Sequence, residues 1–401
     1  MSKGAAIAVS RMAAGIQQSA TLAAGAKARQ LKAEGIHVFD FSLGEPDFPT
    51  PEHICRAAYK AMQDGLTHYT PASGIPELRS AIARTYQRVY GLRVGADQVI
   101  VSNGAKHSIS TALTAVVGPG DEVIIPTPYW VSYSDLVQMT GASYVLVPTT
   151  FESGFKISPA QLGAALTPRT RLVMLNSPGN PTGTVYAREE LEALADVILE
   201  TNAAVLSDEI YERLVYGDAR ATCFATLRPG LPERTLTISG VSKSYAMTGW
   251  RMGWTIGPAA IIKAMGNVQS QQTGCPSSIG QYAALAALEG DQDCVEKMRR
   301  EFEARRDLVC KRLAGMTGIR CPVPGGAFYA FFNVSGHFGR TLGGRKVTDS
   351  MSFCQAALES VHVNLVPGAA FGAEGYARLS FAASREQING GLDRLETLLA
   401  S

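Results

Sequence analysis

The sequence lacks a long apolar run, a block of like charge and a paired-cysteine motif. No stretch approaches the roughly 18 consecutive apolar residues that a membrane-spanning helix needs. The 37 basic and 35 acidic side chains nearly balance and no Lys/Arg block occurs, which argues against nucleic acid as a partner. The seven cysteines are scattered and form no CxxC pair, so neither a disulfide framework nor a metal site is expected. This cysteine pattern favours a reducing compartment, the cytoplasm.

The N-terminal 30 residues superficially resemble a transit peptide, because they carry four basic side chains and no acid precedes Glu34. The apolar run Ala5–Val9 is too short for the core of a secretory signal. We interpret this stretch as an N-terminal arm, with a transit peptide as the alternative.

The segment between about residues 95 and 260 alternates short β-branched runs with stretches of helical periodicity, such as Ala187–Glu200. This alternation predicts an α/β fold with a mostly parallel sheet flanked by helices. The expected strands are Gln98–Ser102, Glu122–Pro126, Tyr144–Pro148, Arg171–Asn176, Ala204–Ser207, Thr235–Ser239 and Met252–Ile256.

The pattern changes after about residue 290 and predicts a second, smaller α+β domain. Helices are expected over Cys294–Leu313, Ser350–Glu359 and Gln387–Leu399, and strands over Phe328–Val334 and Ala377–Phe381. We therefore expect an N-terminal arm (1–47) that packs with the small domain, a large domain (48–290) and a small C-terminal domain (291–401).

Two turns after strands offer groups that could bind an anion, because ligands of open α/β sheets lie beyond the carboxyl ends of the strands. Ser102–His107 opens a helix, so the N–H groups around Gly104 could bind a phosphate, although an ordinary turn is the alternative. Asn176–Gly183 holds two prolines and two glycines, which fix its path and position the Asn180 amide as a donor.

Two further turns carry an acid and a base. Asp208 directly follows a strand, and a buried carboxylate there needs a cationic or donor partner; Glu209 is expected to face solvent or to pair structurally. Lys243 ends another strand among serine and glycine, eight residues before Arg251. These surroundings favour a lowered pKa and nucleophilic amine chemistry, and a surface lysine without a role is the alternative.

These segments carry a resemblance to a known family. Val241–Arg251 looks like the lysine motif of class I, fold-type I aminotransferases, which depend on pyridoxal 5'-phosphate. Six further segments match the family in the order in which the family has them, and together they span nearly the whole chain: Gly44–Phe48, Tyr69–Gly74, Pro128–Trp130, Asn180–Gly183, Ser207–Tyr211 and Arg378–Phe381. The sequence is most similar to the bacterial aspartate/aromatic branch.

The resemblance implies a role for each matching residue. Lys243 would hold the cofactor as a Schiff base and shuttle the proton, Asp208 would keep the pyridine nitrogen protonated, and Tyr211 would bind the phenolic oxygen. Asn180 would bind that oxygen too, and Trp130 would stack on the ring; both would also contact substrate. The phosphate would be held by Arg251, Gly104, Ala105 and Lys106, with Ser239 or Ser242.

The remaining implied roles concern the substrate and a second subunit. Arg378 would grip the substrate's α-carboxylate with two hydrogen bonds, and Gly44 would let the backbone approach it. Tyr69 would reach the phosphate of the neighbouring subunit, so a homodimer with active sites at its interface is implied.

Two departures from the family pattern put strict aspartate specificity in doubt. Gln17 stands where the acidic-substrate branch has a lysine, and Gly274-Cys275 replaces Ser/Thr-Asn. We therefore predict that neutral or aromatic amino acids compete well with acidic ones, unless Lys106 or an arginine of the partner supplies the missing charge.

The expected activity is ping-pong transfer of an amino group from an L-amino acid to a 2-oxo acid. A lyase, an oxidase or a C–C bond-forming enzyme with the same cofactor is the alternative. A binding or regulatory protein on this scaffold is a third hypothesis; it would be expected to lack Lys243 or to carry a basic extension.

Overall fold

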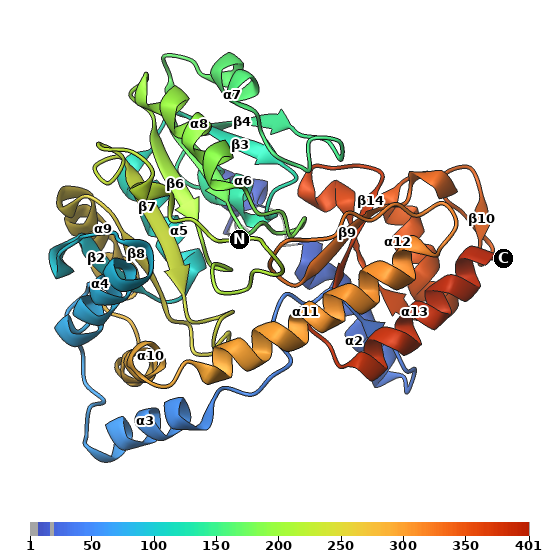
Figure 1. The fold of residues 1–401 in the computed structure, drawn as a ribbon, viewed down its shortest axis with the longest axis horizontal. Coiled ribbons are helices and arrows are strands. Elements are labelled where there is room, and N and C mark those ends of the chain that lie inside the picture. Colours follow the sequence, from blue (N-terminus) through green and yellow to red (C-terminus); the bar gives the residue numbers. More distant parts are fainter. Residues whose placement is uncertain (1–6, 17–19, 401) are drawn as a thin grey trace, which may run out of the picture.

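The computed structural model describes residues 7–16 and 20–400. Its largest sheet has seven strands in the order β2-β8-β7-β6-β5-β3-β4 (Figure 1). The strands are β2 (Val99–Ser102), β3 (Glu122–Thr127), β4 (Ser143–Pro148), β5 (Thr170–Asn176), β6 (Ala204–Asp208), β7 (Thr235–Gly240) and β8 (Gly253–Ile256). Each strand predicted here is confirmed to within one residue at either end. Only the direction of β8, antiparallel to both β2 and β7, departs from a parallel sheet.

Helices cover both faces of this sheet and bury apolar stripes, most of them against the strands and α3 against α10. The helices are α3 (Glu52–Gln63), α4 (Pro76–Tyr90), α5 (Ala105–Val116), α6 (Ser132–Gln138), α7 (Pro159–Ala165), α8 (Arg188–Leu199), α9 (Ala259–Gln272) and α10 (Ser278–Glu289). In α8 the buried side chains are Leu191, Leu194, Ala195 and Ile198, at the spacing that places them on one helix face. One core lies between the sheet and α5, α6 and α9, and another between the sheet and α7 and α8.

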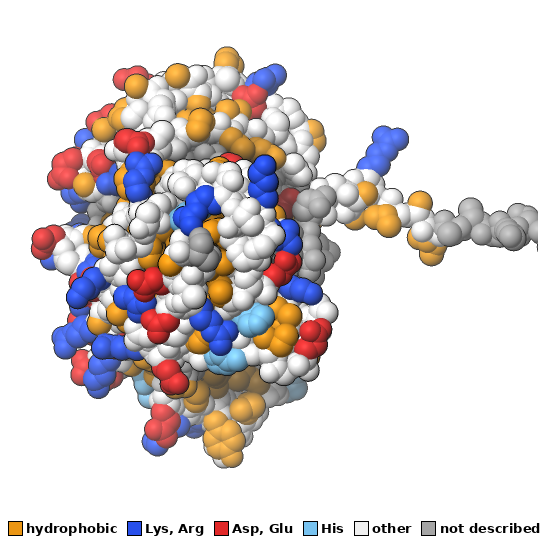
Figure 2. All heavy atoms as spheres, turned by 90° about the vertical axis from the view of Figure 1, so that its right-hand side faces the viewer, with side chains coloured by type: hydrophobic (Ala, Val, Ile, Leu, Met, Phe, Trp, Pro, Cys, Tyr) orange, Lys and Arg blue, Asp and Glu red, His pale blue; other side chains and the backbone are white. Residues whose placement is uncertain are grey.

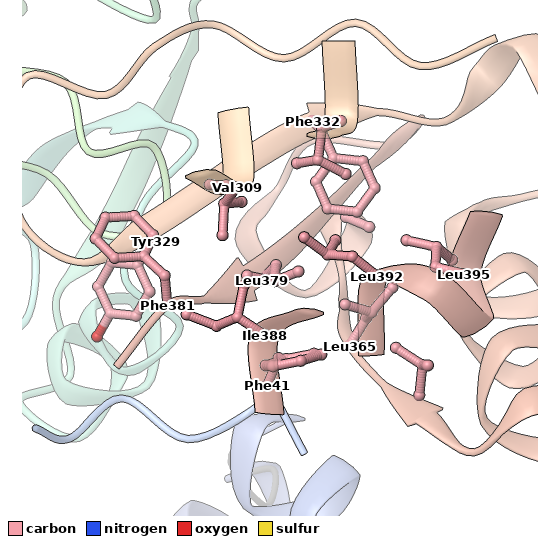
Figure 3. Packing of buried hydrophobic residues seen from close by; sticks show 14 of the residues in the cluster. Phe41, Val309, Tyr329, Phe332, Leu365, Leu379, Phe381, Ile388, Leu392 and Leu395 are labelled. Atoms are coloured by element: carbon pink, nitrogen blue, oxygen red, sulfur yellow. The ribbon is translucent and has the colours of Figure 1, made fainter. Parts of the chain in front are cut away.

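The C-terminal part forms a smaller layered unit around a three-stranded antiparallel sheet, β13-β14-β9. Its elements are α11 (Asp293–Ala314), β9 (Tyr329–Asn333), β10 (Thr341–Leu342), β11 (Arg345–Lys346), α12 (Ser350–Val361), β13 (Val366–Pro367), β14 (Tyr376–Ser380) and α13 (Arg385–Ala400). Leucine and phenylalanine side chains of these elements form one apolar core (Figure 3). The helices and strands predicted for this region are confirmed.

The N-terminal segment packs against these C-terminal elements. Strand β1 (Phe39–Asp40) pairs in parallel with β12 (Val363–Asn364), and α2 (Ala20–Ala33) lies beside it. By contrast, α1 (Arg11–Gly15) buries none of its side chains and stands off from the main body (Figure 2). The domain boundaries at 47/48 and 290/291 stay predictions. Across the described ranges, no helix is long and apolar enough to cross a membrane.

Candidate active site

A cavity of about 270 Å³ lies where the carboxyl ends of β5, β6 and β7 meet the C-terminal unit. Most of the predicted site residues line it: Gly44, Ala105, Lys106, Trp130, Asn180, Asp208, Tyr211, Ser242, Lys243, Arg251 and Arg378. The structure therefore brings together side chains from segments spread over more than 300 positions of sequence.

Lys243 follows β7, and its Nζ donates a hydrogen bond of 2.6 Å to the carbonyl oxygen of Gly44. Burial lowers the pKa of this amine to about 8; Glu45 opposes the shift, and the positive charge of Arg251 adds to it. The lowered pKa predicted from the sequence is confirmed, with burial rather than the neighbouring arginine as its main cause. The amine therefore loses its proton more readily than an exposed lysine does.

Asp208 is the last residue of β6, and its carboxylate is buried at the cavity wall. Tyr133 donates to Oδ2 at 2.6 Å and the Ile210 N–H donates to Oδ1 at 3.2 Å. Burial raises the pKa of the carboxyl to about 6, although these hydrogen bonds and Lys243 oppose the rise. A carboxylate accepts more than two hydrogen bonds, so this one suits a cationic N–H group in the cavity.

Glu209 points to the opposite side of the strand end, as strand alternation requires. Its side chain is buried and accepts hydrogen bonds from the Ser207 hydroxyl (2.8 Å) and the Phe224 N–H (3.0 Å). Of the two placements expected for it, solvent exposure is wrong and structural pairing is confirmed.

Positive charge gathers where α5 begins. Gly104, the N-cap of this helix, has φ 86°, and a Cβ there would collide with the Arg251 guanidinium. The Arg251 guanidinium donates to the Thr248 carbonyl oxygen at 2.9 Å, and the Lys106 Nζ lies 4.9 Å from the centre of the Trp130 ring. A helix N-terminus beside the Arg251 guanidinium is a binding site for an anion such as phosphate, and Lys106 adds a second cation to this part of the cavity.

Three predicted residues lie elsewhere. Ser239 is fully buried, and its hydroxyl donates to Glu212 at 2.6 Å. Strand alternation turns this side chain away from the cavity, so its expected contact with the phosphate is not supported. Gly104 contributes to the cavity through Arg251 rather than by lining it. Tyr69 is 93% exposed and lies outside the cavity of its own chain.

Of the two departures from the family pattern, the structure describes only Gly274-Cys275. Gly274 and Cys275 follow the end of α9 and do not line the cavity of their own chain. Gln17 falls outside the described residues.

Arg378 closes the other end of the cavity and is 1% exposed. Its guanidinium donates to the Asn180 Oδ1 at 2.9 Å and to the Ser42 carbonyl oxygen at 2.7 Å, between the rings of Tyr329 and Phe371. In the part of the chain that the structure describes, its Nε has no partner and no carboxylate pairs with it. A buried cation in this state calls for an anionic ligand.

Sequence reasoning missed several residues of this site. The Asn176 Oδ1 accepts from the Asn180 N–H and its Nδ2 donates to the Asp208 carbonyl oxygen, both at 2.8 Å, so it ties two site residues together. Its place at the end of a predicted strand, inside the proline-rich loop, was a usable signal. Tyr133 and Tyr329 carry no such local signal.

These groups fit pyridoxal phosphate. An anion site at α5, a buried carboxylate at β6, the flat face of Trp130 and the Lys243 amine all line one cavity. The cofactor presents a phosphate, a pyridine nitrogen, a flat ring and an aldehyde, one for each of these groups.

Comparisons with known proteins agree with this fit. The family described as aminotransferase class I and II matches residues 36–395. An aspartate/prephenate aminotransferase of Cereibacter sphaeroides is 46% identical, covering 96% of this chain and 97% of its own. An aspartate aminotransferase of Geobacillus stearothermophilus is 45% identical over 98% of both chains.

Solved structures of similar proteins share the whole fold. The aspartate aminotransferase of Rhizobium meliloti superposes with a TM-score of 0.95 at 44% identity, covering 98% of this chain and 99% of its own. The Thermus thermophilus enzyme with maleate gives 0.92 at 40% identity, covering 98% and 100%. Transamination is thus favoured over the other outcomes of the same cofactor. The chain belongs to the class I and II aminotransferases and is a pyridoxal-phosphate-dependent aminotransferase.

Proposed function

We propose that this aminotransferase uses aspartate as its amino donor and a 2-oxo acid as its acceptor. The observation that carries the proposal is a pair of cations, Arg378 and Lys106, that line one cavity. In the described part of the chain, neither forms an ion pair with a carboxylate within 4.0 Å. A dicarboxylic amino acid supplies one anionic group for each.

We assign a role to each of four cavity residues from its position: Asp208, Lys243, Tyr211 and Asn180. When bound, pyridoxal phosphate supplies an electron sink for the electrons released at the substrate's α-carbon. Asp208 holds a proton on the ring nitrogen by its negative charge, and the Lys243 amine, with its lowered pKa, moves the proton at the α-carbon. Tyr211 and Asn180 donate to the phenolic oxygen.

The anion site is assigned to the cofactor's phosphate. Arg251, Ser242 and the N-terminus of α5 hold it, and Trp130 packs on the flat ring. These residues keep the reacting carbon beside Lys243 and exclude water from that side.

At the substrate end, Arg378 binds the α-carboxylate that every amino acid carries. Asn180 and Ser42 already hold the guanidinium, so little freedom is lost on binding. Lys106 binds the distal carboxylate and replaces the charge that Gln17 does not supply. The names of the relatives and the maleate in the Thermus structure support acidic substrates.

Measuring kcat/KM for aspartate, glutamate, alanine, phenylalanine and methionine tests this proposal. We expect aspartate to exceed alanine and phenylalanine by at least about a hundredfold, the value of one charge-assisted contact. Neutral or aromatic amino acids within about tenfold of aspartate would reject the proposal and uphold the competition predicted from Gln17. Phenylpyruvate and prephenate belong among the tested acceptors, because several relatives are named for prephenate.

We also propose a cytoplasmic homodimer. Tyr69 and Ile7 are nearly fully exposed, and Val9 of the same N-terminal arm as Ile7 is largely exposed, which suits contact with a second subunit. Light scattering of the purified protein tests the dimer. Tyr69→Phe, combined in mixed dimers with a Lys243→Ala subunit, tests whether Tyr69 serves the neighbouring site. The seven free cysteines support a reducing compartment.

A further inference from the structure

Tyr329 is a cavity residue to which none of the roles above is assigned. It is the first residue of β9 and is 1% exposed. Its ring belongs to the apolar core of the C-terminal unit, and its hydroxyl lies at the outer end of that cluster, away from the leucines (Figure 3). The side chain therefore reaches from the core into the active-site cavity.

Three contacts join Tyr329 to groups from distant segments. Its hydroxyl lies 2.8 Å from the Tyr211 hydroxyl, and its ring centre lies 4.5 Å from the Arg378 guanidinium. A Cβ on Gly44 would lie only 2.7 Å from the Tyr329 hydroxyl, so any larger residue at this position would displace that hydroxyl. The carbonyl oxygen of the same glycine accepts the hydrogen bond from Lys243.

The direction of the bond between the two hydroxyls decides what Tyr211 can do. If Tyr211 donated to Tyr329, its only proton would be taken up by that bond and would not be available to a ligand in the cavity. Burial raises the pKa of both hydroxyls, and the Arg378 charge opposes the rise at both. With Tyr329 as the donor, the Tyr211 oxygen accepts, and the Tyr211 proton is free for a ligand in the cavity that both residues line.

We propose that Tyr329 is a positioning residue that serves both ends of the cavity. Its hydroxyl donates to the Tyr211 oxygen and so directs the Tyr211 proton into the cavity, and its ring supports the Arg378 guanidinium from one face. This inference rests on the roles proposed above for Tyr211 and Arg378.

The two functions are separable by substitution. Tyr329→Phe keeps the ring and removes the hydroxyl, and Tyr329→Leu removes both. The titratable and charged groups around the Tyr211 hydroxyl are Tyr329, Arg378 and Asp208, and Lys243 also lines the cavity. Only Tyr329 is changed in the two variants. Tyr376→Phe is a matched control, because Tyr376 stacks on Phe331 in the core and does not line the cavity.

The first measurement is the pH midpoint of the colour change of the cofactor-loaded enzyme without substrate. A donor at the phenolic oxygen favours loss of the proton from the nitrogen that joins Lys243 to the cofactor, so weakening Tyr211 raises the midpoint. We expect Tyr329→Phe to raise it by about 0.5 pH unit, as the loss of one neutral hydrogen bond implies. Tyr376→Phe should leave it unchanged.

The second measurement is the dissociation constant of maleate, a dicarboxylate probe. Tyr329→Phe should leave it within about twofold of the wild type, and Tyr329→Leu should weaken binding about fivefold through the lost cation–π contact. Equal maleate affinity in Tyr329→Leu and the wild type would overturn the support assigned to the ring.

A double-mutant cycle with Tyr211→Phe separates this inference from the proposed function. If Tyr329 acts through Tyr211, its substitution by Phe has no further effect on the midpoint in the Tyr211→Phe background. If Tyr211→Phe moves the midpoint and Tyr329→Phe does not, the Tyr329 inference alone is wrong. If Tyr211→Phe leaves the midpoint in place, the role proposed for Tyr211 fails, and the hydroxyl's part in the inference fails with it.

Discussion

The two ends of the active-site cavity are built in different ways. At the cofactor end, Asp208 ends β6 and Lys243 comes shortly after the neighbouring parallel strand β7, so the hydrogen bonds of one sheet fix the spacing of the two segments. At the carboxylate end, Arg378 comes from β14, Tyr329 from β9 and the Ser42 carbonyl from the N-terminal segment. Side-chain contacts between remote segments hold that end together. Local motifs specify the first end, whereas tertiary packing specifies the second.

Replacing Lys243 should produce the largest effect at the cofactor end. Lys243→Ala removes both the covalent anchor and the group that carries the proton, so we expect turnover to fall by at least about 10⁵-fold in a folded protein. Borohydride treatment followed by mass spectrometry should place the cofactor adduct on Lys243 in the wild type. An adduct on another lysine would show that the cofactor end is misassigned.

Asp208→Asn should lower kcat by about 10³-fold or more while the cofactor stays bound, because an amide does not stabilise a positive charge on the ring nitrogen. Glu209→Gln is the matched control: it neutralises the adjacent buried acid, which faces away from the cavity. Steady-state rates of the two variants test the contrast. A rate for Asp208→Asn within about tenfold of wild type would contradict its role.

At the carboxylate end, Arg378→Lys keeps the charge but loses the planar fork. We expect kcat/KM to fall by about 10²-fold for every amino acid alike, because all of them carry the α-carboxylate. Cofactor affinity should stay the same, as measured by titrating the apoenzyme. A loss confined to acidic substrates would mean that Arg378 binds the distal carboxylate instead.

Lys106→Gln should have a smaller and selective effect. We expect kcat/KM to fall about 10- to 100-fold for aspartate and by less than about threefold for alanine, because only aspartate carries a distal carboxylate. Lys263→Gln, on the exposed face of α9, serves as the control. An equal loss for both amino acids would place Lys106 at the cofactor's phosphate, the role that the family resemblance implies.

The smallest expected effect is a change in thermal stability at Glu212, which accepts a hydrogen bond from Ser239 of β7. Burial raises the pKa of its carboxyl from 4.5 to about 8. The folded chain therefore retains a proton that the unfolded chain loses, and this contribution to stability, complete below about pH 4.5, is lost as the pH rises to about 8. Glu212→Gln keeps an acceptor for Ser239 and removes the titration. Between pH 5 and 8.5, the Tm of the Glu212→Gln variant should fall by about 2 °C less than the Tm of the wild type, which calorimetry can measure.

The cofactor end could be predicted from sequence because Asp208 lies at the end of a strand and Lys243 lies shortly after the end of the next one. The position of a side chain relative to a strand end is a local property, so Asp208 and Lys243 were placed correctly. Ser239 was not, because the choice between it and Ser242 depends on which strand face meets the cavity. Glu209 was expected in solvent or in structural pairing; the Phe224 N–H that pairs with it belongs to another segment.

The carboxylate end could be predicted only in part. Arg378 and its partner Asn180 were found by their motifs, but Tyr329 was not, since nothing near it in the sequence indicates that it contacts Tyr211 and Gly44. The reversed direction of β8 was also missed. Strand direction depends on the connections between strands, which periodicity does not reveal.

That reversed strand has a consequence for how the chain acquires its fold. β2, which leads into the N-terminus of α5, is an edge strand of the seven-stranded sheet and pairs within it only with β8, where Val101 lies opposite Trp254. A chain emerging from the ribosome must therefore hold β2 without its sheet partner until the strands from β3 to β7 have been synthesised. Closing so long a loop is slow, because its entropy is lost before the contacts form. β2, and with it the anion site at the N-terminus of α5, should thus be among the last parts of the large domain to become ordered. The open edge of β2 is the segment most exposed to mispairing in the nascent chain.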